Sequence, residues 1–220
     1  MGIISKDEIL ETVLNFLPFP HQDKISVVDV GAGQGALSEK ALRQFPHAHV
    51  TLLDSSQQML EQARKRLSAF EARITIAVGD FNSPNWYTGI GNPDAVVSAI
   101  ALHYLEPKNR DIFFNKVFQV LKTPGCFINA GSFLASDPFI QERWDDQILE
   151  YTRKTLLETE GQDIPIDELM RKREAEGAKA GVNRYRLVDQ ESLLSEAGFR
   201  TVEIVWQYLS FAVVVAYKKD

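Results

Sequence analysis

The sequence has one cysteine, no long apolar run and no excess of positive charge, and each absence removes a class of protein. Cys126 cannot form a disulfide within the chain, which favours a reducing compartment. No apolar segment reaches the ~20 residues of a membrane-spanning helix, and residues 1–10 turn charged too early for a signal peptide. The net charge of -6 argues against a nucleic-acid partner. We therefore expect a cytoplasmic protein that binds neither nucleic acid nor membrane.

Short apolar runs alternate with amphipathic stretches between residues 23 and 130. Runs rich in β-branched residues predict strands, and the amphipathic stretches between them predict helices. The predicted strands are 26–30, 50–54, 74–78, 95–99 and 126–130, and the predicted helices are 36–44, 56–69 and 110–121. This alternation predicts an α/β domain over residues 1–220, with a parallel sheet covered on both faces.

A charged helical insertion, residues 136–181, separates the fifth predicted strand from the end of the chain. Gly161 and Pro165 divide it into a long helix, to about residue 160, and a shorter one over 166–176. Gly177 and Gly181 predict a flexible exit from the insertion.

The last elements are predicted to be a helix and a hairpin. Asp189 is the expected N-cap of the helix, which ends at Gly198. Strands over 201–208 and 211–217 follow with a tight turn between them, so they should be antiparallel and insert into the sheet as a hairpin.

The stretch VVDVGAGQGALS, residues 27–38, places a carboxylate inside an apolar run just before a cluster of glycines. Ionised Asp29 is costly to bury unless it is paired, and a negative charge beneath a glycine loop repels a pyrophosphate and attracts an ammonium group. Gly31, Gly33 and Gly35 allow a tight turn and a close approach of a ligand. The stretch therefore favours a ligand with a cationic group. The alternative is a buried Asp29 that holds backbone N–H groups of the loop.

Two further predicted strands end on acidic residues. Asp54 in TLLDSS is placed to accept both hydroxyl groups of a ribose. Asp80 and Phe81 in VGDF suit the amino group and the face of an adenine. A ligand with an amino group, a ribose and an adenine but no pyrophosphate is S-adenosylmethionine.

Taken in order, these motifs resemble those of class I S-adenosylmethionine-dependent methyltransferases. The resemblance rests on VVDVGAGQG, TLLDSS with Met59, VGDF, DAVVSAIALHYLEP and LKTPGCFINAG, and resumes at the AGF of residues 197–199. It implies an α/β fold with a Rossmann-like seven-stranded sheet, mostly parallel with an antiparallel C-terminal hairpin strand, plus a helical insertion before the last helix. It also implies S-adenosylmethionine as the cofactor and S-adenosylhomocysteine as its product. The cofactor-binding residues implied are Asp29, Gly31, Gly33, Gly35, Asp54, Ser55, Met59, Asp80, Phe81, Ser98 and Ala99.

Residues near the expected acceptor have weaker signals. His103 follows the fourth predicted strand and is a candidate general base, with a packed histidine as the alternative. Arg184 is a candidate anchor for an anionic acceptor, with a surface ion pair as the alternative, and Tyr185 is a candidate catalytic residue. Trp144 either lines the acceptor pocket or packs the insertion onto the core.

We interpret the chain as a methyltransferase acting on a small-molecule acceptor, with helix 6–17 and insertion 136–181 as a cap over that acceptor. In-line displacement at an activated methyl group needs positioning more than a strong nucleophile, and we expect no metal site. One alternative resembles carboxy-S-adenosylmethionine synthase, but Leu193 stands where that family has an arginine. The other is a catalytically inactive cofactor-binding protein. The acceptor's identity and the oligomeric state stay open, with a homodimer among the candidates.

Overall fold

A seven-stranded sheet with the order β3-β2-β1-β4-β5-β7-β6 forms the centre of the computed structural model, which describes residues 5–219. The strands are β1 (Ser26–Val30), β2 (His49–Asp54), β3 (Ile74–Val78), β4 (Ala95–Ala99), β5 (Gly125–Ser132), β6 (Thr201–Tyr208) and β7 (Phe211–Lys218). Strands β1 to β5 are parallel, and β7 runs antiparallel to both β5 and β6. The predicted fold class is therefore confirmed, including the antiparallel hairpin at the C-terminal end. The position of β7 between β5 and β6 adds a strand order that the sequence did not predict.

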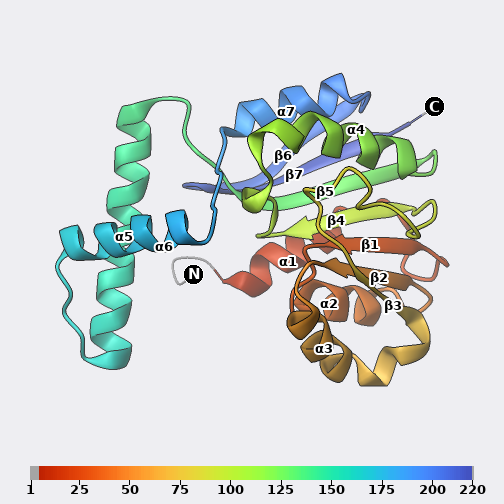
Figure 1. The fold of residues 1–220 in the computed structure, drawn as a ribbon, viewed down its shortest axis with the longest axis horizontal. Coiled ribbons are helices and arrows are strands. Elements are labelled where there is room, and N and C mark those ends of the chain that lie inside the picture. Colours follow the sequence, from red (N-terminus) through yellow and green to blue (C-terminus); the bar gives the residue numbers. More distant parts are fainter. Residues whose placement is uncertain (1–4, 220) are drawn as a thin grey trace.

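Helices cover both faces of this sheet (Figure 1). One face carries α1 (Lys6–Asn15), α2 (Ala36–Gln44) and α3 (Gln57–Arg66), and the other carries α4 (Arg110–Val120) and α7 (Leu187–Glu196). The remaining helices, α5 (Pro138–Glu160) and α6 (Ile166–Lys179), stand beyond one edge of the layers and form what we call the arm. No helix within residues 5–219 is long and apolar enough to cross a membrane.

Strand β1 lies at the position where the strand order reverses. It pairs with β2 on one side and with β4 on the other, so Val27, Val28 and Val30 are buried between neighbours and helices on both faces. The connections after β1 and β4 leave in opposite directions and open a crevice at the carboxyl ends of these strands. Ligands of open α/β sheets bind in such a crevice.

Two predicted helix boundaries in the middle of the chain are wrong. The helix predicted over 56–69 ends at Arg66, and a separate 3-10 helix follows over Ser68–Arg73. The second helix of the insertion runs on to Lys179, so Gly177 lies inside it and is not part of a flexible exit. Gly181 does take the left-handed conformation expected of a glycine that ends a helix, with φ of +71°.

The predicted N-cap of the last helix is also wrong. Helix α7 begins at Leu187, and Asp189 lies in its first turn. The Asp189 carboxylate accepts hydrogen bonds from the backbone and the side chain of Arg186, which is the residue that caps the helix. An acidic residue is favourable both at the N-cap and in the first turn of a helix. The sequence alone therefore did not show which of these two positions Asp189 occupies.

Candidate active site

A cavity of about 1080 Å³ lies at the carboxyl ends of β1, β2 and β4. We call it the loop cavity, because the glycine loop after β1 forms one wall. Most of the residues expected to bind the cofactor line it: Asp29, Gly31, Gly33, Asp54, Ser55, Met59, Asp80, Phe81 and Ala99. The motifs that are far apart in the sequence therefore meet at one edge of the sheet, as their order predicted.

Asp29 lines this cavity although its residue is only 2% exposed. Burial raises the pKa of its carboxyl group to about 6, opposed by hydrogen bonds with Ser38. The Ser38 hydroxyl donates to Asp29 Oδ2 at 2.6 Å, which ties β1 to α2. The hydrogen bonds of Asp29 thus go to Ser38 of α2, whereas the alternative expectation placed them on backbone N–H groups of the glycine loop. Asp29 also faces the space where a cationic group can lie.

Asp54 holds the glycine loop from the neighbouring strand. Its Oδ2 accepts a hydrogen bond from the Gly33 backbone N–H at 2.8 Å, and its Oδ1 accepts one from Ser56 N–H at 2.8 Å. The Gly31 N–H donates to the carbonyl of Leu53 at 2.8 Å, which draws the loop over the end of β2. The carboxylate is therefore fixed in place beside the cavity before any ligand arrives.

Two glycines of the loop, Gly31 and Gly35, are constrained by different neighbours. Gly31 has φ of +72°, and a Cβ built on it would lie 2.3 Å from the Cβ of Ala101. Gly35 has φ of +76° and faces Ala63 of α3, 3.1 Å from its own ideal Cβ position, so it does not line the cavity. Gly35 was expected to contact the cofactor, but the structure gives it a packing role between loop and helix.

The residues predicted to bind the adenine, Asp80 and Phe81, lie in the turn that follows β3. The Asp80 carboxylate accepts a hydrogen bond from Asn82 N–H at 2.8 Å, and Phe81 packs edge-on against Phe113 at 6.3 Å between ring centroids. The Asn82 side chain accepts from Glu106 N–H and donates to the Tyr104 carbonyl, so it fixes the opposite wall. Asn82 was missed in the sequence, although its place directly after the motif was a usable signal.

The end of β4 differs from the expectation at Ser98. This residue is fully buried, its hydroxyl donates to the Val30 carbonyl at 2.8 Å, and it does not line the loop cavity. Ala99 and Ile100 line the cavity instead. Ile100 has φ of +56°, which is uncommon for a β-branched residue, and no sequence signal predicts it.

A second cavity, of about 600 Å³, lies between the arm and the same edge of the sheet. We call it the arm cavity. Its apolar walls come mainly from α5, α6 and β7, and include Ile148, Leu149, Leu156, Leu169, Val182 and Phe211. Ile100 lines both cavities, so the strained end of β4 is their common wall.

His103 and Arg184, two of the residues expected near the acceptor, line the arm cavity. His103 Nδ1 and Arg184 Nη1 are buried and have no hydrogen-bond partner among residues 5–219. Burial, with the nearby Arg184 charge, lowers the pKa of His103, so its imidazole is neutral at pH 7. Within the same residues Arg184 makes no ion pair, which excludes the surface pair considered as its alternative.

Tyr185 is placed away from both cavities. Its hydroxyl donates to Gln190 Oε1 at 3.0 Å, the guanidinium of Arg110 lies 4.2 Å from its ring centroid, and its ring packs against Phe133. Burial raises the pKa of its hydroxyl well above the ordinary value. The catalytic role expected of Tyr185 is therefore not supported, because the hydroxyl is enclosed in the core.

Trp144 is half-buried on α5 and lines neither cavity, which leaves packing as its role.

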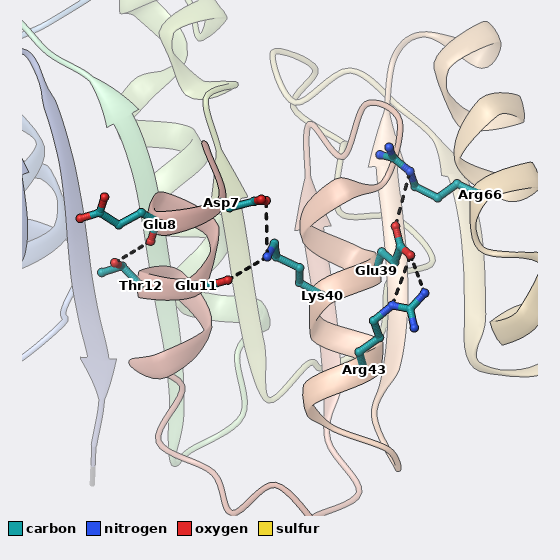
Figure 2. A network of polar contacts seen from close by, with 8 residues as sticks. All are labelled: Asp7, Glu8, Glu11, Thr12, Glu39, Lys40, Arg43 and Arg66. Carbon is teal, nitrogen blue, oxygen red and sulfur yellow. Dashed lines mark hydrogen bonds and ion pairs between the residues drawn. The ribbon is translucent and has the colours of Figure 1, made fainter. Parts of the chain in front are cut away.

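Helix α1 was expected to cap the acceptor, but it lies beside the loop cavity and not beside the arm cavity. Its residues Lys6, Asp7 and Leu10 line the loop cavity. Lys40 of α2 reaches α1 through ion pairs with Asp7 at 3.4 Å and Glu11 at 3.0 Å (Figure 2).

Comparison with known proteins agrees with the overall fold. Residues 27–125 match a family described as a methyltransferase domain. The chain is 22% identical over 209 residues to the carboxy-S-adenosyl-L-methionine synthase of Nautilia profundicola, covering 95% of this chain and 82% of that protein. An O-methyltransferase family protein from Burkholderia thailandensis superposes with a TM-score of 0.68 at 13% identity, covering 97% of this chain and 56% of that one.

Human N-acetylserotonin methyltransferase, solved in complex with SAM, superposes with a TM-score of 0.60 at 18% identity. The match covers 96% of this chain and 52% of that one, so this chain spans little more than half the length of these two structures. Together the structural matches confirm the fold, and the family match places a methyltransferase domain over residues 27–125, where the motifs lie.

Proposed function

We propose that this chain, a class I S-adenosylmethionine-dependent methyltransferase by fold and motifs, methylates a small molecule held in the arm cavity. The observation that carries the proposal is the common wall at Ile100. Because this residue lines both cavities, a cofactor in the loop cavity and an acceptor in the arm cavity would meet at the carboxyl end of β4. Holding two reactants in contact is the main requirement of this reaction.

The residues of the loop cavity fit S-adenosylmethionine. Buried Asp29 suits the ammonium group of the methionine part, and Asp54 suits the ribose hydroxyls. Asp80 and Phe81 suit the amino group and the face of the adenine. The absence of a side chain at Gly31 leaves room for the ligand beside Ala101. When bound, S-adenosylmethionine supplies a sulfonium methyl group, which passes to a nucleophilic atom as the carbon–sulfur bonding pair stays on sulfur.

His103 is the residue suited to take a proton from the acceptor. It lines the arm cavity next to Ile100, and its lowered pKa keeps the imidazole neutral and able to accept a proton at pH 7. Its carbonyl accepts a hydrogen bond from Asn183 N–H at 2.6 Å, which fixes the segment on which it stands. The arm forms one side of the cavity, and an arm that closes on a bound acceptor would shield it from water.

A second candidate function, synthesis of carboxy-S-adenosylmethionine, is favoured by the curated relatives. Eight of them with this name are 22–26% identical over most of this chain. Against it stands Leu193, at the position where the family has an arginine. Leu193 packs into the apolar cluster beneath α4 and α7, so it offers no charge to a carboxylate.

Turnover with a labelled methyl donor tests the proposal. The protein is incubated with methyl-labelled S-adenosylmethionine and a panel of hydroxy, amino and thiol metabolites, and both products are analysed by mass spectrometry. We expect label in an acceptor together with S-adenosylhomocysteine. A carboxylated sulfonium product would establish the second function. Cofactor binding with no product for any acceptor would contradict both and favour the catalytically inactive cofactor-binding protein.

A further inference from the structure

The arm cavity combines apolar walls with polar atoms that lack partners. Leu149 and Leu169 are the buried apolar side chains of α5 and α6, and both line the cavity. Against these walls stand His103 Nδ1 and Arg184 Nη1, both buried and without a hydrogen-bond partner among the described residues. Buried polar groups are normally paired, so unpartnered atoms in the wall of a cavity indicate a ligand that completes them.

The charges around the cavity point to an anion. Lys172, Arg173 and Arg184 line it, against one acidic residue, Glu176. Arg173 is already engaged, because its Nη1 lies 2.8 Å from Asp145 Oδ1. Lys172 is exposed to solvent, whereas Arg184 is half-buried. Of the three cations, Arg184 is therefore the one that is partly removed from water and yet makes no ion pair within residues 5–219.

An unpaired, half-buried guanidinium is unfavourable on its own. Burial lowers the pKa of Arg184, and the neighbouring charge of Arg173 adds to that effect, while the charge of Asp145, which pairs with Arg173, opposes it. A guanidinium nevertheless keeps its charge in proteins, so a carboxylate ligand is the group that relieves this cost. The planar fork of an arginine also matches a carboxylate in two parallel hydrogen bonds.

We propose that the arm cavity binds an organic carboxylate as the methyl acceptor, with its carboxylate on Arg184 and its apolar body against α5 and α6. This inference rests on the proposed methyl transfer and adds the class of the substrate. A monocarboxylate is favoured over a phosphate ester, because one unpaired guanidinium matches one negative charge and Glu176 opposes a second. The nucleophilic atom would lie at the end of the molecule that reaches Ile100, the wall shared with the loop cavity.

The proposal is tested by binding, independently of turnover. The protein is saturated with S-adenosylhomocysteine and titrated with 4-hydroxybenzoate and with its neutral counterpart, 4-hydroxybenzamide, in calorimetry or ligand-observed NMR. The two probes have nearly the same size and shape, and the amide replaces the charged carboxylate with a neutral group that keeps one acceptor oxygen. Their ratio of affinities therefore reports on the carboxylate. We expect the carboxylate to bind about 10- to 100-fold more tightly, as charge-assisted hydrogen bonds predict.

Variants locate the preference on one side chain. Arg184→Gln should bring the two probes to equal affinity, and Arg184→Lys should keep part of the difference. Arg143→Gln is the matched control, because Arg143 is an exposed arginine of α5 that pairs with Asp146 at 3.5 Å and lines neither cavity. It should leave the preference unchanged.

Equal affinity of the two probes for the wild-type protein overturns the proposal, and so does failure of the carboxylate to bind at all. A preference that survives in Arg184→Gln overturns the assignment of the residue. If that variant does not fold, Arg184→Lys and the wild-type ratio still decide the question. A carboxylate preference without turnover would contradict the methyl transfer alone, whereas turnover of neutral acceptors only would contradict the carboxylate alone.

Discussion

The two cavities differ in whether their charged groups have hydrogen-bond partners within the protein. In the loop cavity the acidic groups already have partners within the protein: Ser38 donates to Asp29, and the Gly33 backbone N–H donates to Asp54. In the arm cavity Arg173 pairs with Asp145, but His103 Nδ1 and Arg184 Nη1 are buried and have no hydrogen-bond partner in the described part of the chain. One site is therefore complete without a ligand, and the other becomes complete only with one.

The difference follows from the elements that carry each site. The loop cavity lies at the ends of parallel strands whose neighbours fix them on both sides. The arm cavity is closed by two helices that bury one apolar side chain each, Leu149 and Leu169, and leave others such as Leu157 and Met170 exposed. Few buried contacts mean low local stability, so we expect the arm to adapt to its ligand more than the loop does.

The largest effect should come from His103. We expect His103→Gln to lower kcat by about 100-fold or more, because a general base contributes that much, while cofactor affinity stays within about twofold. Single-turnover kinetics and calorimetry with the acceptor found by the turnover panel measure the two quantities. His47→Gln is the control, since His47 is exposed and lines neither cavity. An equal loss of cofactor affinity in His103→Gln would mean that the two cavities are not separate in function.

The second largest effect should come from Gly31→Ala, which should destabilise the loop after β1. The new Cβ would meet that of Ala101 at 2.3 Å, and φ of +72° is unfavourable for alanine. Overpacking and the left-handed conformation together should lower the free energy of unfolding by about 3 kcal/mol, measured in urea. Gly91→Ala separates the two causes, because Gly91 has φ of +70° but nothing within 4 Å of its ideal Cβ. It should cost only about 1 kcal/mol; equal losses would show that the close approach to Ala101 does not matter.

Asp54→Ala tests whether the loop cavity is complete before the ligand binds. We expect cofactor affinity to fall by ~1.5–3 kcal/mol through loss of the ribose contact. The unfolding free energy should also fall by about 1–2 kcal/mol without ligand, because Gly33 N–H and Ser56 N–H lose their acceptor. Asp54→Asn retains an oxygen for one of them and should lose less stability. Unchanged stability of the ligand-free alanine variant would show that water replaces the carboxylate.

Asp29 should make cofactor binding depend on pH. Its pKa of about 6 in the folded protein lies above the ordinary aspartate value of 3.8, so its contribution to stability is full below pH 3.8 and is lost as the pH rises through about 6. A cationic ligand group favours the ionised carboxylate and should release the proton. Affinity for S-adenosylmethionine should therefore be about tenfold weaker at pH 5 than at pH 7.

Calorimetry in two buffers of different ionisation enthalpy measures the released proton directly. Asp29→Asn cannot titrate and should show neither the proton release nor the weakening between pH 7 and pH 5. A pH dependence that persists in this variant would assign it to another group. Without ligand, the difference in unfolding free energy between Asp29→Asn and the wild type should favour the variant more at pH 7 than at pH 4. The reason is that the wild type buries an ionised carboxylate at pH 7 and a neutral carboxyl group at pH 4.

Much of the loop cavity was predictable from the sequence, because local patterns encode it. The valines around Asp29 mark a buried strand, and the glycines that follow mark a tight turn whatever the rest of the chain does. Asp54 is the last residue of β2, and Asp80 follows the end of β3 by two residues. Parallel strands bring their carboxyl ends to one edge, so three separate motifs predict one site.

The arm cavity was less predictable, because packing between distant elements decides it. Arg184 lines the arm cavity and its neighbour Tyr185 is buried in the core, and the sequence did not show which of the two would face a cavity. That choice depends on Gln190 and on Arg110, which enclose the tyrosine. The left-handed backbone of Ile100 is likewise set by its surroundings and has no signal in the residue itself.

The smallest effect should come from Lys40, which joins α2 to α1 at the rim of the loop cavity (Figure 2). If these ion pairs held α1 as a movable lid, Lys40→Gln would change the rate of cofactor dissociation strongly. However, α1 buries Ile9, Leu10 and Val13 in the core, and apolar burial outweighs exposed ion pairs. We therefore expect less than about a twofold change in dissociation rate, measured by stopped flow, and less still at high salt. A tenfold change would make α1 a lid, and the loop cavity would then need its ligand to close, as the arm cavity does.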